Sequence, residues 1–304
     1  MQEQNTDFRD GVIAGLAAYL LWGFLPVYFK TVAVVAPLEV LSHRIIWAIP
    51  FGAAILFARH QWPEVRRALT HRAMLGWLIL SAMIIAINWL VYIWAIQDGR
   101  IFETSLGYYI NPLFYMMVGV VFFGERLRRL QSIAVLLAAI GVIVLTASGG
   151  KLPLVALSLA ATITAYGVIR KRVVIGGMPG LFVETLLLSP FAVVWFIWLN
   201  GSGQAMFASG DASMTFWLVM AGPITALPLL CFALATRRLP LTTIGFMQFL
   251  APTLQFLTGI YYGEQLTTAH LICFGCIWLA VAFFSYDAIS TNTKMPPQKK
   301  PARA

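Results

Sequence analysis

The sequence is poor in charge and in cysteine. Of its 304 residues only 11% are charged and 60% are hydrophobic, whereas a soluble domain carries about 25% charged residues. A soluble fold this apolar would expose large sticky patches, so the composition excludes a soluble enzyme or a nucleic-acid-binding domain. The three cysteines give no disulfide framework. Cys273 and Cys276 form a CxxC inside an apolar run, which favours two buried small side chains over a metal or redox pair.

Enzyme signatures are also missing. The chain contains no HExxH, no Gly-x-Ser-x-Gly, no Walker P-loop and no Asp-rich magnesium motif. We therefore expect no catalytic residues, no metal and no cofactor. Transport driven directly by ATP would need a partner that supplies the nucleotide-binding domain.

What the sequence does contain is a series of ten apolar runs of about 18 to 24 residues, close to the ~20 residues that a helix needs to cross a bilayer. They lack the alternation of barrel strands. The runs predict an all-α integral membrane protein of ten transmembrane helices. A polar arm (1–10) precedes them, the first run is expected to be a retained span, and a basic, disordered tail (290–304) follows. The runs are 11–29, 37–58, 73–96, 101–123, 130–147, 152–170, 179–199, 213–235, 241–262 and 267–287.

The basic residues alternate from loop to loop. Of the 21 Lys and Arg residues, 17 fall on the side that holds both termini, and only Lys30, Arg100 and Lys151 fall on the other; Arg44 lies within a run. The positive-inside rule then places both termini in the cytoplasm. A nucleic-acid site would instead gather its charge on one folded face, so no nucleic-acid partner is expected.

An offset of about 140 residues aligns the two halves of the chain. It pairs Pro112 with Pro252 and, after one residue of slippage, Gly124-Glu125 with Gly263-Glu264. Each half (11–147 and 152–287) holds five spans, so the halves would enter the membrane from opposite sides. Inverted repeats of this kind are typical of secondary transporters, which place the substrate in a central cavity between the repeats.

The chain resembles the drug/metabolite transporter superfamily, of the EamA type, over about residues 9–290. The resemblance rests on Trp22-Gly23, on the paired Pro and Gly-Glu elements, and on the segment from Pro37 to Trp47, which is similar to the RarD branch of chloramphenicol-sensitivity permeases. It implies a multi-pass permease of the bacterial inner membrane that moves small metabolites or drugs, commonly outward and often coupled to an ion gradient.

Ionisable residues inside a span are functional candidates because their burial in lipid is expensive. Glu39 and His43 are i, i+4 neighbours that can touch, and Trp47 follows one turn later. Arg44 points to another face, where it would hold an anionic or carbonyl group of the substrate. Alternatively, Glu39 is interfacial and Arg44 snorkels outward. Glu184 pairs with Arg44 at offset 140, either as a counter-ion arrangement or by coincidence.

Polar and proline residues mark further candidates for the cavity. Pro112 and Pro252 each free a carbonyl one turn earlier and are expected to kink their helices. The expected substrate-binding residues share helix faces with one another, although interhelical hydrogen bonding as packing is an alternative. Beyond His43, Arg44 and Trp47, they are Asn88, Tyr92, Tyr108, Asn111, Tyr115, Gln248 and Gln255.

The favoured function is a secondary transporter for a small amphipathic molecule, and the runner-up is a membrane-embedded enzyme acting on a lipid-like substrate. The expected partners are the small-molecule substrate and the lipid bilayer, and the sequence leaves the oligomeric state open. His43, which can titrate between pH 5 and 8, with Glu39 and Glu184 as further ionisable candidates, would couple transport to protons. In the rival interpretation the protein is a uniporter in which His43 only forms hydrogen bonds.

Overall fold

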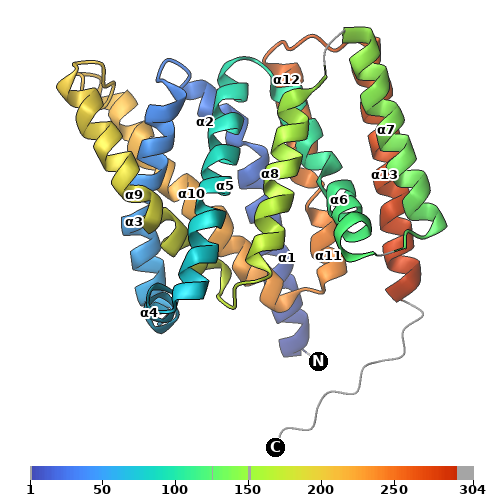
Figure 1. Cartoon of the computed structure of the whole chain (residues 1–304), viewed down its shortest axis with the longest axis horizontal. Coiled ribbons are helices and arrows are strands. Elements are labelled where there is room, and N and C mark those ends of the chain that lie inside the picture. The colour runs from blue at the N-terminus through green and yellow to red at the C-terminus, as the bar shows by residue number, and fades with distance from the viewer. Residues whose placement is uncertain (1, 125, 150–151, 293–304) are drawn as a thin grey trace, which may run out of the picture. The chain divides into compact units, whose positions relative to one another are not determined.

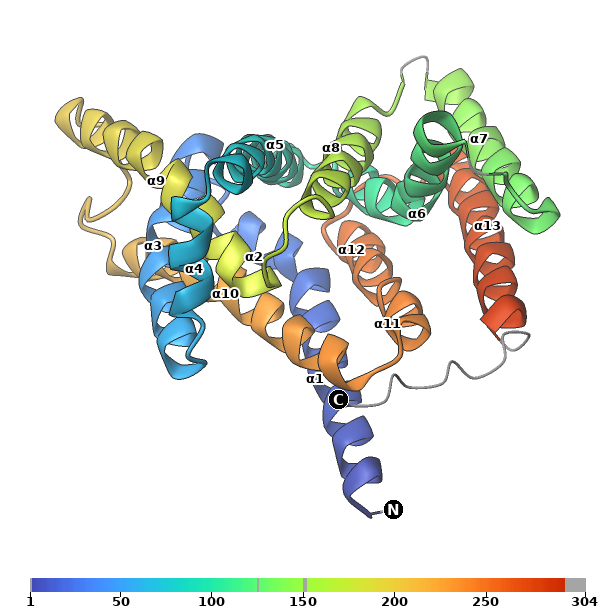
Figure 2. The same ribbon diagram turned by 60° about the horizontal axis from the view of Figure 1, so that its bottom comes forward.

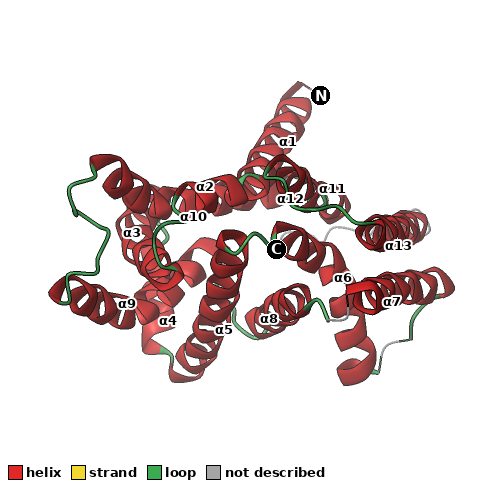
Figure 3. Ribbon diagram, turned by 90° about the horizontal axis from the view of Figure 1, so that it is seen from above, coloured by secondary structure: helices red, strands yellow, loops and turns green. Residues whose placement is uncertain are grey.

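The computed structural model describes residues 2–124, 126–149 and 152–292, and within these ranges every regular element is a helix (Figure 3). Eight helical segments are long and apolar enough to cross a membrane. The protein is therefore an all-helical, multi-pass membrane protein. Two of the ten expected spans do not meet that length as single helices: one is the 17-residue α8, and the other is divided between α11 and α12.

The chain forms two compact units, and the boundaries fall at 111/112, 153/154 and 265/266. The first unit holds all the ionisable candidates. Its helices are α1 (Gln2–Gly23), α2 (Leu25–Thr31), α3 (Pro37–Ala58), α4 (Trp62–Thr70), α5 (Arg72–Gln97), the first part of α6 (Ile101–Phe123), α8 (Leu154–Arg170), α9 (Gly177–Gly201), α10 (Ala212–Arg238), α11 (Leu241–Met247) and α12 (Leu250–Tyr261).

The second unit holds the rest of α6, together with α7 (Arg129–Gly149) and α13 (Thr268–Asn292). α7 and α13 run side by side (Figure 1). Gly141 permits this packing, because a Cβ there would lie 3.0 Å from the Cys273 carbonyl oxygen. Cys273 is fully buried, as the CxxC analysis expects, whereas Cys276 is half-buried. Of the tail expected to be disordered, residues 290–292 belong to α13, and the remainder lies outside the described residues, as does Glu125.

Two expected spans are broken. The first divides at Phe24, with Pro26 at the start of α2. The ninth divides between α11 and α12 (Figure 2), where Pro252 has no N–H to donate to the carbonyl of Gln248. α6 by contrast continues through Pro112 as one helix. A proline thus breaks one of the paired helices and is accommodated within the other.

One helix was not expected from the sequence. α4 occupies the segment between the second and third spans, buries Val65 and Ala68, and exposes Arg66 and Arg67. Its apolar side packs on α9 and α5. The sequence analysis treats this stretch only as a basic loop, because nine residues are too few for an apolar run.

Candidate functional site

Arg44 lies in the middle of the first unit and is held by its neighbours in a fixed orientation. Its Nε donates to Thr225 Oγ1 at 2.8 Å, and its guanidinium carbon lies 4.1 Å from the centre of the Trp89 ring. The side chain is buried, and among the described residues no carboxylate forms an ion pair with it. Arg44 therefore does not snorkel outward; it is a buried cation that no described carboxylate neutralises.

Aromatic side chains surround this cation. Phe29 lies 5.9 Å from the guanidinium carbon, and the phenol rings of Tyr28, Tyr92 and Tyr108 are close enough to interact with it electrostatically. Tyr92 contacts Phe29 and Tyr108 edge-on, at centroid distances of 5.8 and 5.7 Å. The buried hydroxyl of Tyr92 has no hydrogen-bond partner among the described residues. Of the residues predicted from sequence, the structure therefore brings Arg44, Tyr92 and Tyr108 together.

A glycine allows α3 and α10 to approach closely enough for the Arg44–Thr225 contact. A Cβ at Gly222 would collide with the backbone carbonyl of Trp47 and lie 2.8 Å from its Cβ. Thr225, one turn later on α10, donates its own hydroxyl proton to the Ala221 carbonyl at 2.8 Å and so keeps a lone pair for Arg44. The close helix contact and the position of the cation thus depend on the same turn of α10.

Glu39, at the start of α3, holds the α9–α10 loop (residues 202–211). Its Oε1 accepts hydrogen bonds from the backbone N–H groups of Met206 at 2.8 Å and Phe207 at 3.2 Å. The Phe207 ring then lies over His43, with centroids 4.8 Å apart. Glu39 is 2% exposed, so it is a buried carboxylate that binds the loop backbone.

His43 links Glu39 to Trp47 along one face of α3. Its Nδ1 accepts a hydrogen bond from Trp47 Nε1 at 3.2 Å, which assigns the neutral ring's proton to Nε2. That Nε2 lies 4.0 Å from Glu39 Oε1 and has no hydrogen-bond partner in the part of the chain that the structure describes. The i, i+4 neighbourhood expected from sequence is present, at a separation too long for a direct hydrogen bond.

Glu184 forms a separate polar network on α9. It accepts hydrogen bonds from Ser81 Oγ at 2.6 Å and Tyr166 Oη at 3.1 Å, and it lies 3.6 Å from Arg170 Nη1. A Cβ at Gly180 would collide with the Arg170 guanidinium, so this glycine makes room for the cation. The counter-ion of Glu184 is therefore Arg170, and the structure does not join Glu184 to Arg44.

Several predicted cavity residues instead connect helices. Asn88 Nδ2 donates to the Leu159 carbonyl at 3.2 Å and to Thr162 Oγ1 at 2.8 Å. Asn111 Oδ1 accepts from Thr164 at 2.9 Å, and Gln255 Nε2 donates to the Trp22 carbonyl at 3.2 Å. These contacts fit the alternative of interhelical hydrogen bonding. Gln248 lies half-buried at the α11–α12 break, and Tyr115 belongs to the second unit.

The sequence analysis did not single out Trp89, Thr225, Ser81, Tyr166 or Arg170. Nothing in the sequence distinguishes Trp89 or Thr225 from other residues of their type. Their contact with Arg44 depends on which faces of α5 and α10 are turned toward α3. Arg170 was counted among the basic residues of the loops. In the structure it is the last residue of α8, and its side chain is only 14% exposed.

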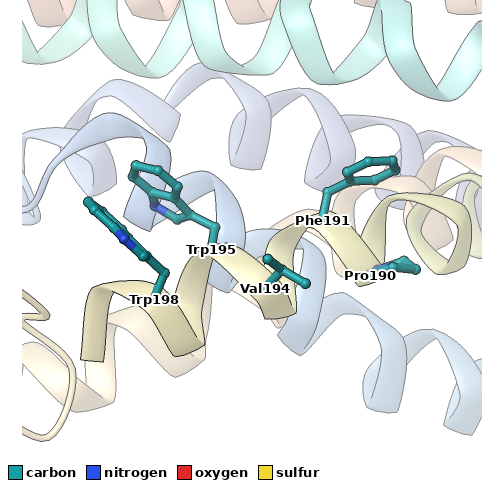
Figure 4. A pocket seen from close by; sticks show the side chains of 5 residues that line it. All are labelled: Pro190, Phe191, Val194, Trp195 and Trp198. Atoms are coloured by element: carbon teal, nitrogen blue, oxygen red, sulfur yellow. The ribbon is translucent and has the colours of Figure 1, made fainter. Parts of the chain in front are cut away.

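A shallow apolar groove lies on α9, away from these polar groups. It is lined by residues of one helix, and the rings of Trp195 and Trp198 lie next to each other with centroids 4.8 Å apart (Figure 4). Phe191 and Val194 beside them are largely exposed. An apolar surface of this kind is expected to contact lipid, and no charged side chain lines it.

Glu264 closes the end of α12 and caps α6. Its Oε2 accepts a hydrogen bond from the Phe102 backbone N–H at 3.0 Å. Burial, with a smaller contribution from Glu103, raises the pKa of this carboxyl to about 7, although the backbone N–H groups of Ile101 and Phe102 and the charge of Lys30 oppose the shift. Glu264 thus joins two helices through a carboxylate that titrates near neutral pH.

Comparison with known proteins gives consistent matches. Residues 9–147 match the EamA-like transporter family. The chain is 42% identical over 287 residues to the protein RarD of Salmonella typhi, covering 94% of this chain and 98% of that protein. It is also 42% identical to an uncharacterized transporter of Pseudomonas aeruginosa, over 96% of this chain and 98% of the relative. A crystal structure with 18% identity and a TM-score of 0.62 covers 91% of this chain and 98% of that one, which shows a shared fold.

Proposed function

Because the chain belongs to the EamA-like transporter family, in its RarD branch, we propose that it is a secondary transporter which moves a small amphipathic molecule across the bacterial inner membrane. The observation that carries the proposal is Arg44, a buried cation within a candidate span whose terminal nitrogens have no carboxylate partner among the described residues. Charged groups inside a membrane typically mark a substrate or ion pathway. A structural arginine would be expected to have a counter-ion, as Arg170 has in Glu184.

The proposed topology has ten crossings and two inverted repeats, with both termini in the cytoplasm. α8 and the α11–α12 pair supply the two crossings that fall short of full helix length. Single cysteines at Gly201 and Gln265, in a background lacking the three native cysteines, should then react with an impermeant thiol reagent from outside, and one at Arg128 should not. Reaction of position 128 from outside would overturn this topology.

Alternating access requires that the substrate site open to one side at a time. At one end of α3 the α9–α10 loop is held by Glu39, and we assign this end to the outside. At the other end, Glu64 Oε2 accepts from the Gly176 N–H at 3.0 Å and Arg67 Nη2 donates to the Val174 carbonyl at 3.4 Å. These contacts close the α8–α9 connection on the cytoplasmic side and would break when the protein opens inward.

Proton coupling is assigned to the Glu39–His43 pair. A proton taken up by Glu39 removes the carboxylate charge and weakens its hold on the N–H groups of Met206 and Phe207. A proton taken up by His43 adds at Nδ1 and displaces the hydrogen bond from Trp47. Each protonation state would therefore favour a different position of the loop. His43→Gln keeps a polar side chain but cannot titrate near neutral pH. It should lose accumulation driven by a pH gradient and retain downhill flux.

The test of the proposal as a whole is an uptake screen in proteoliposomes, with and without a pH gradient. We expect saturable movement of at least one amphipathic compound class that Gln248→Leu impairs without loss of folded protein. If His43→Gln still concentrates the substrate as the parent does, the coupling assignment fails and Glu39 or Glu184 becomes the next candidate. Absence of flux across the whole screen, with well-folded protein, would contradict the transporter function.

A further inference from the structure

Arg44 has hydrogen-bonding capacity that the protein does not use. A guanidinium carries five N–H donors, and the described hydrogen bonds account only for the one on Nε, which binds Thr225. The carboxylates nearest to it in the sequence and in the predicted repeat are already engaged. Glu39 binds two backbone N–H groups, and Glu184 binds Ser81, Tyr166 and Arg170. No rearrangement of these groups supplies a counter-ion without breaking another contact.

The surroundings fix how the remaining donors are presented. The guanidinium carbon lies over the Trp89 ring, 4.1 Å from its centre, and 5.9 Å from the centre of the Phe29 ring. With Nε tied to Thr225, the terminal nitrogens form the free edge. The hydroxyl of Tyr92, which is 2% exposed and lacks a partner among the described residues, is a further unused polar group beside the cation.

We propose that Arg44 and Tyr92 bind the carboxylate of an organic monoanion with a flat, apolar body; this inference rests on the proposed transport function and names its substrate class. The planar fork of a guanidinium matches both oxygens of a carboxylate. The flat apolar part of the anion would pack against aromatic rings, namely those of Trp89, Phe29 and Tyr108. A neutral amide would leave the buried charge uncompensated, and an amine would be repelled by it.

Binding can be measured on the purified full chain in detergent, independently of transport. The probes are three compounds of one shape: 2-naphthoate, 2-naphthamide and 2-naphthylmethylammonium, with binding read from ligand-induced thermal stabilisation and from calorimetry at pH 7.5. We expect naphthoate to bind at least about 10-fold more tightly than the amide, since charge-assisted hydrogen bonds are about twice as strong as neutral ones. The amine should not bind measurably.

Variants locate this preference at the proposed residues. Arg44→Gln should remove the difference between naphthoate and naphthamide, and Arg44→Lys should restore it only in part because an ammonium lacks the planar fork. Tyr92→Phe should weaken naphthoate binding by about 3- to 10-fold, the usual effect of one lost hydrogen bond. Gly76→Ala, at a site with open space around it, is the matched control.

Four outcomes would overturn the assignment. The first is equal binding of naphthoate and naphthamide to the parent, and the second is unchanged discrimination between them in folded Arg44→Gln. The third is unchanged naphthoate binding in Tyr92→Phe. The fourth is that inorganic chloride alone occupies the site, so that chloride but not naphthoate stabilises protein prepared in gluconate. If Arg44→Gln does not fold, the parent and Tyr92→Phe still decide the question. Binding of naphthoate without any flux would contradict the transport function and leave the site intact. Flux of neutral compounds that is insensitive to Arg44→Lys would contradict the site and leave the transport function intact.

Discussion

Replacing Glu39 should release the α9–α10 loop from the first turn of α3. The two hydrogen bonds from Met206 and Phe207, at 2.8 and 3.2 Å, end on the same carboxylate oxygen. Hydrogen bonds to charged groups contribute about 1.5 kcal/mol or more each, so their complete loss corresponds to roughly 3 kcal/mol. Glu39→Ala should thus raise the fraction of time that the loop is open by about 100-fold.

A second variant, Glu39→Gln, tests how much of this effect comes from the carboxylate charge. The amide oxygen still accepts both N–H groups but without the charge, which halves the strength of each bond. We therefore expect a loss of about 1.5 kcal/mol and a roughly 10-fold increase in opening. Comparison of Glu39→Gln with Glu39→Ala thus separates the effect of losing the charge from the effect of losing the hydrogen-bond acceptor.

Hydrogen exchange of the loop amides is the direct assay. The protection of the Met206 and Phe207 amides should fall by these two factors. The amides of Ser213 and Met214, which bind Asp211 Oδ1 at 2.8 and 3.1 Å in the adjacent helix cap, should keep theirs. If Glu39→Ala changes exchange at Met206 by less than about 2-fold, or changes Met214 equally, the loop is held by something other than Glu39.

Two further predictions concern stability. Gly222→Ala should lower stability by about 1 to 3 kcal/mol, because the new Cβ forces α10 away from Trp47 on α3. Thermal melting against Gly76→Ala, where nothing lies within 4 Å, measures the effect, and equal melting of the two would refute it. For Glu264, burial raises the carboxyl pKa from 4.5 to about 7, so folding favours its protonated form. The stabilisation that this group gives to the folded state is fully present below pH 4.5 and is lost as the pH rises from 4.5 to 7. Above pH 7 the free energy of unfolding no longer changes through this group. Allowing for solvent screening of this partly exposed group, we expect about 1 kcal/mol. Glu264→Gln should remove this slope from the pH dependence of chemical denaturation.

Helix positions could be predicted from the sequence where apolar runs are long and their ends are marked. The run 37–58 has the bounds of α3, because Pro37 occupies the first helical position and the apolar run stops before Arg59. The run 241–262 contains the α11–α12 break, which hydropathy cannot detect because both pieces are apolar. α4 escaped detection for the opposite reason, since its short apolar face lies among arginines.

The candidate site could be predicted only in part. Arg44 stood out because a charge within an apolar run is costly, and Tyr92 and Tyr108 were selected as polar groups on helix faces. Their neighbours Trp89 and Thr225 depend on the rotation of α5 and α10 against α3, which the hydrophobic period does not specify when whole helices are apolar. For the same reason the sequence could not decide whether Glu184 faces Arg44 or, as observed, Arg170.

The loop and the cation site are connected by a short path on α3, and this connection has a thermodynamic consequence. Phe207 of the loop lies over His43 and 6.3 Å from the Trp47 ring, and His43 directly precedes Arg44. If a carboxylate bound at Arg44 shifts the loop between its closed and open positions, the loop must alter carboxylate affinity by the same factor, because coupling between two sites is reciprocal. The change in Met206 protection on adding naphthoate to the parent therefore predicts the sign of the change in naphthoate affinity once Glu39→Ala keeps the loop open for much of the time. Protection that increases with ligand requires weaker binding to Glu39→Ala, and protection that decreases requires tighter binding. If saturating naphthoate leaves Met206 protection unchanged, loop and site are independent, and alternating access is then carried by other contacts, such as those of Glu64 and Arg67.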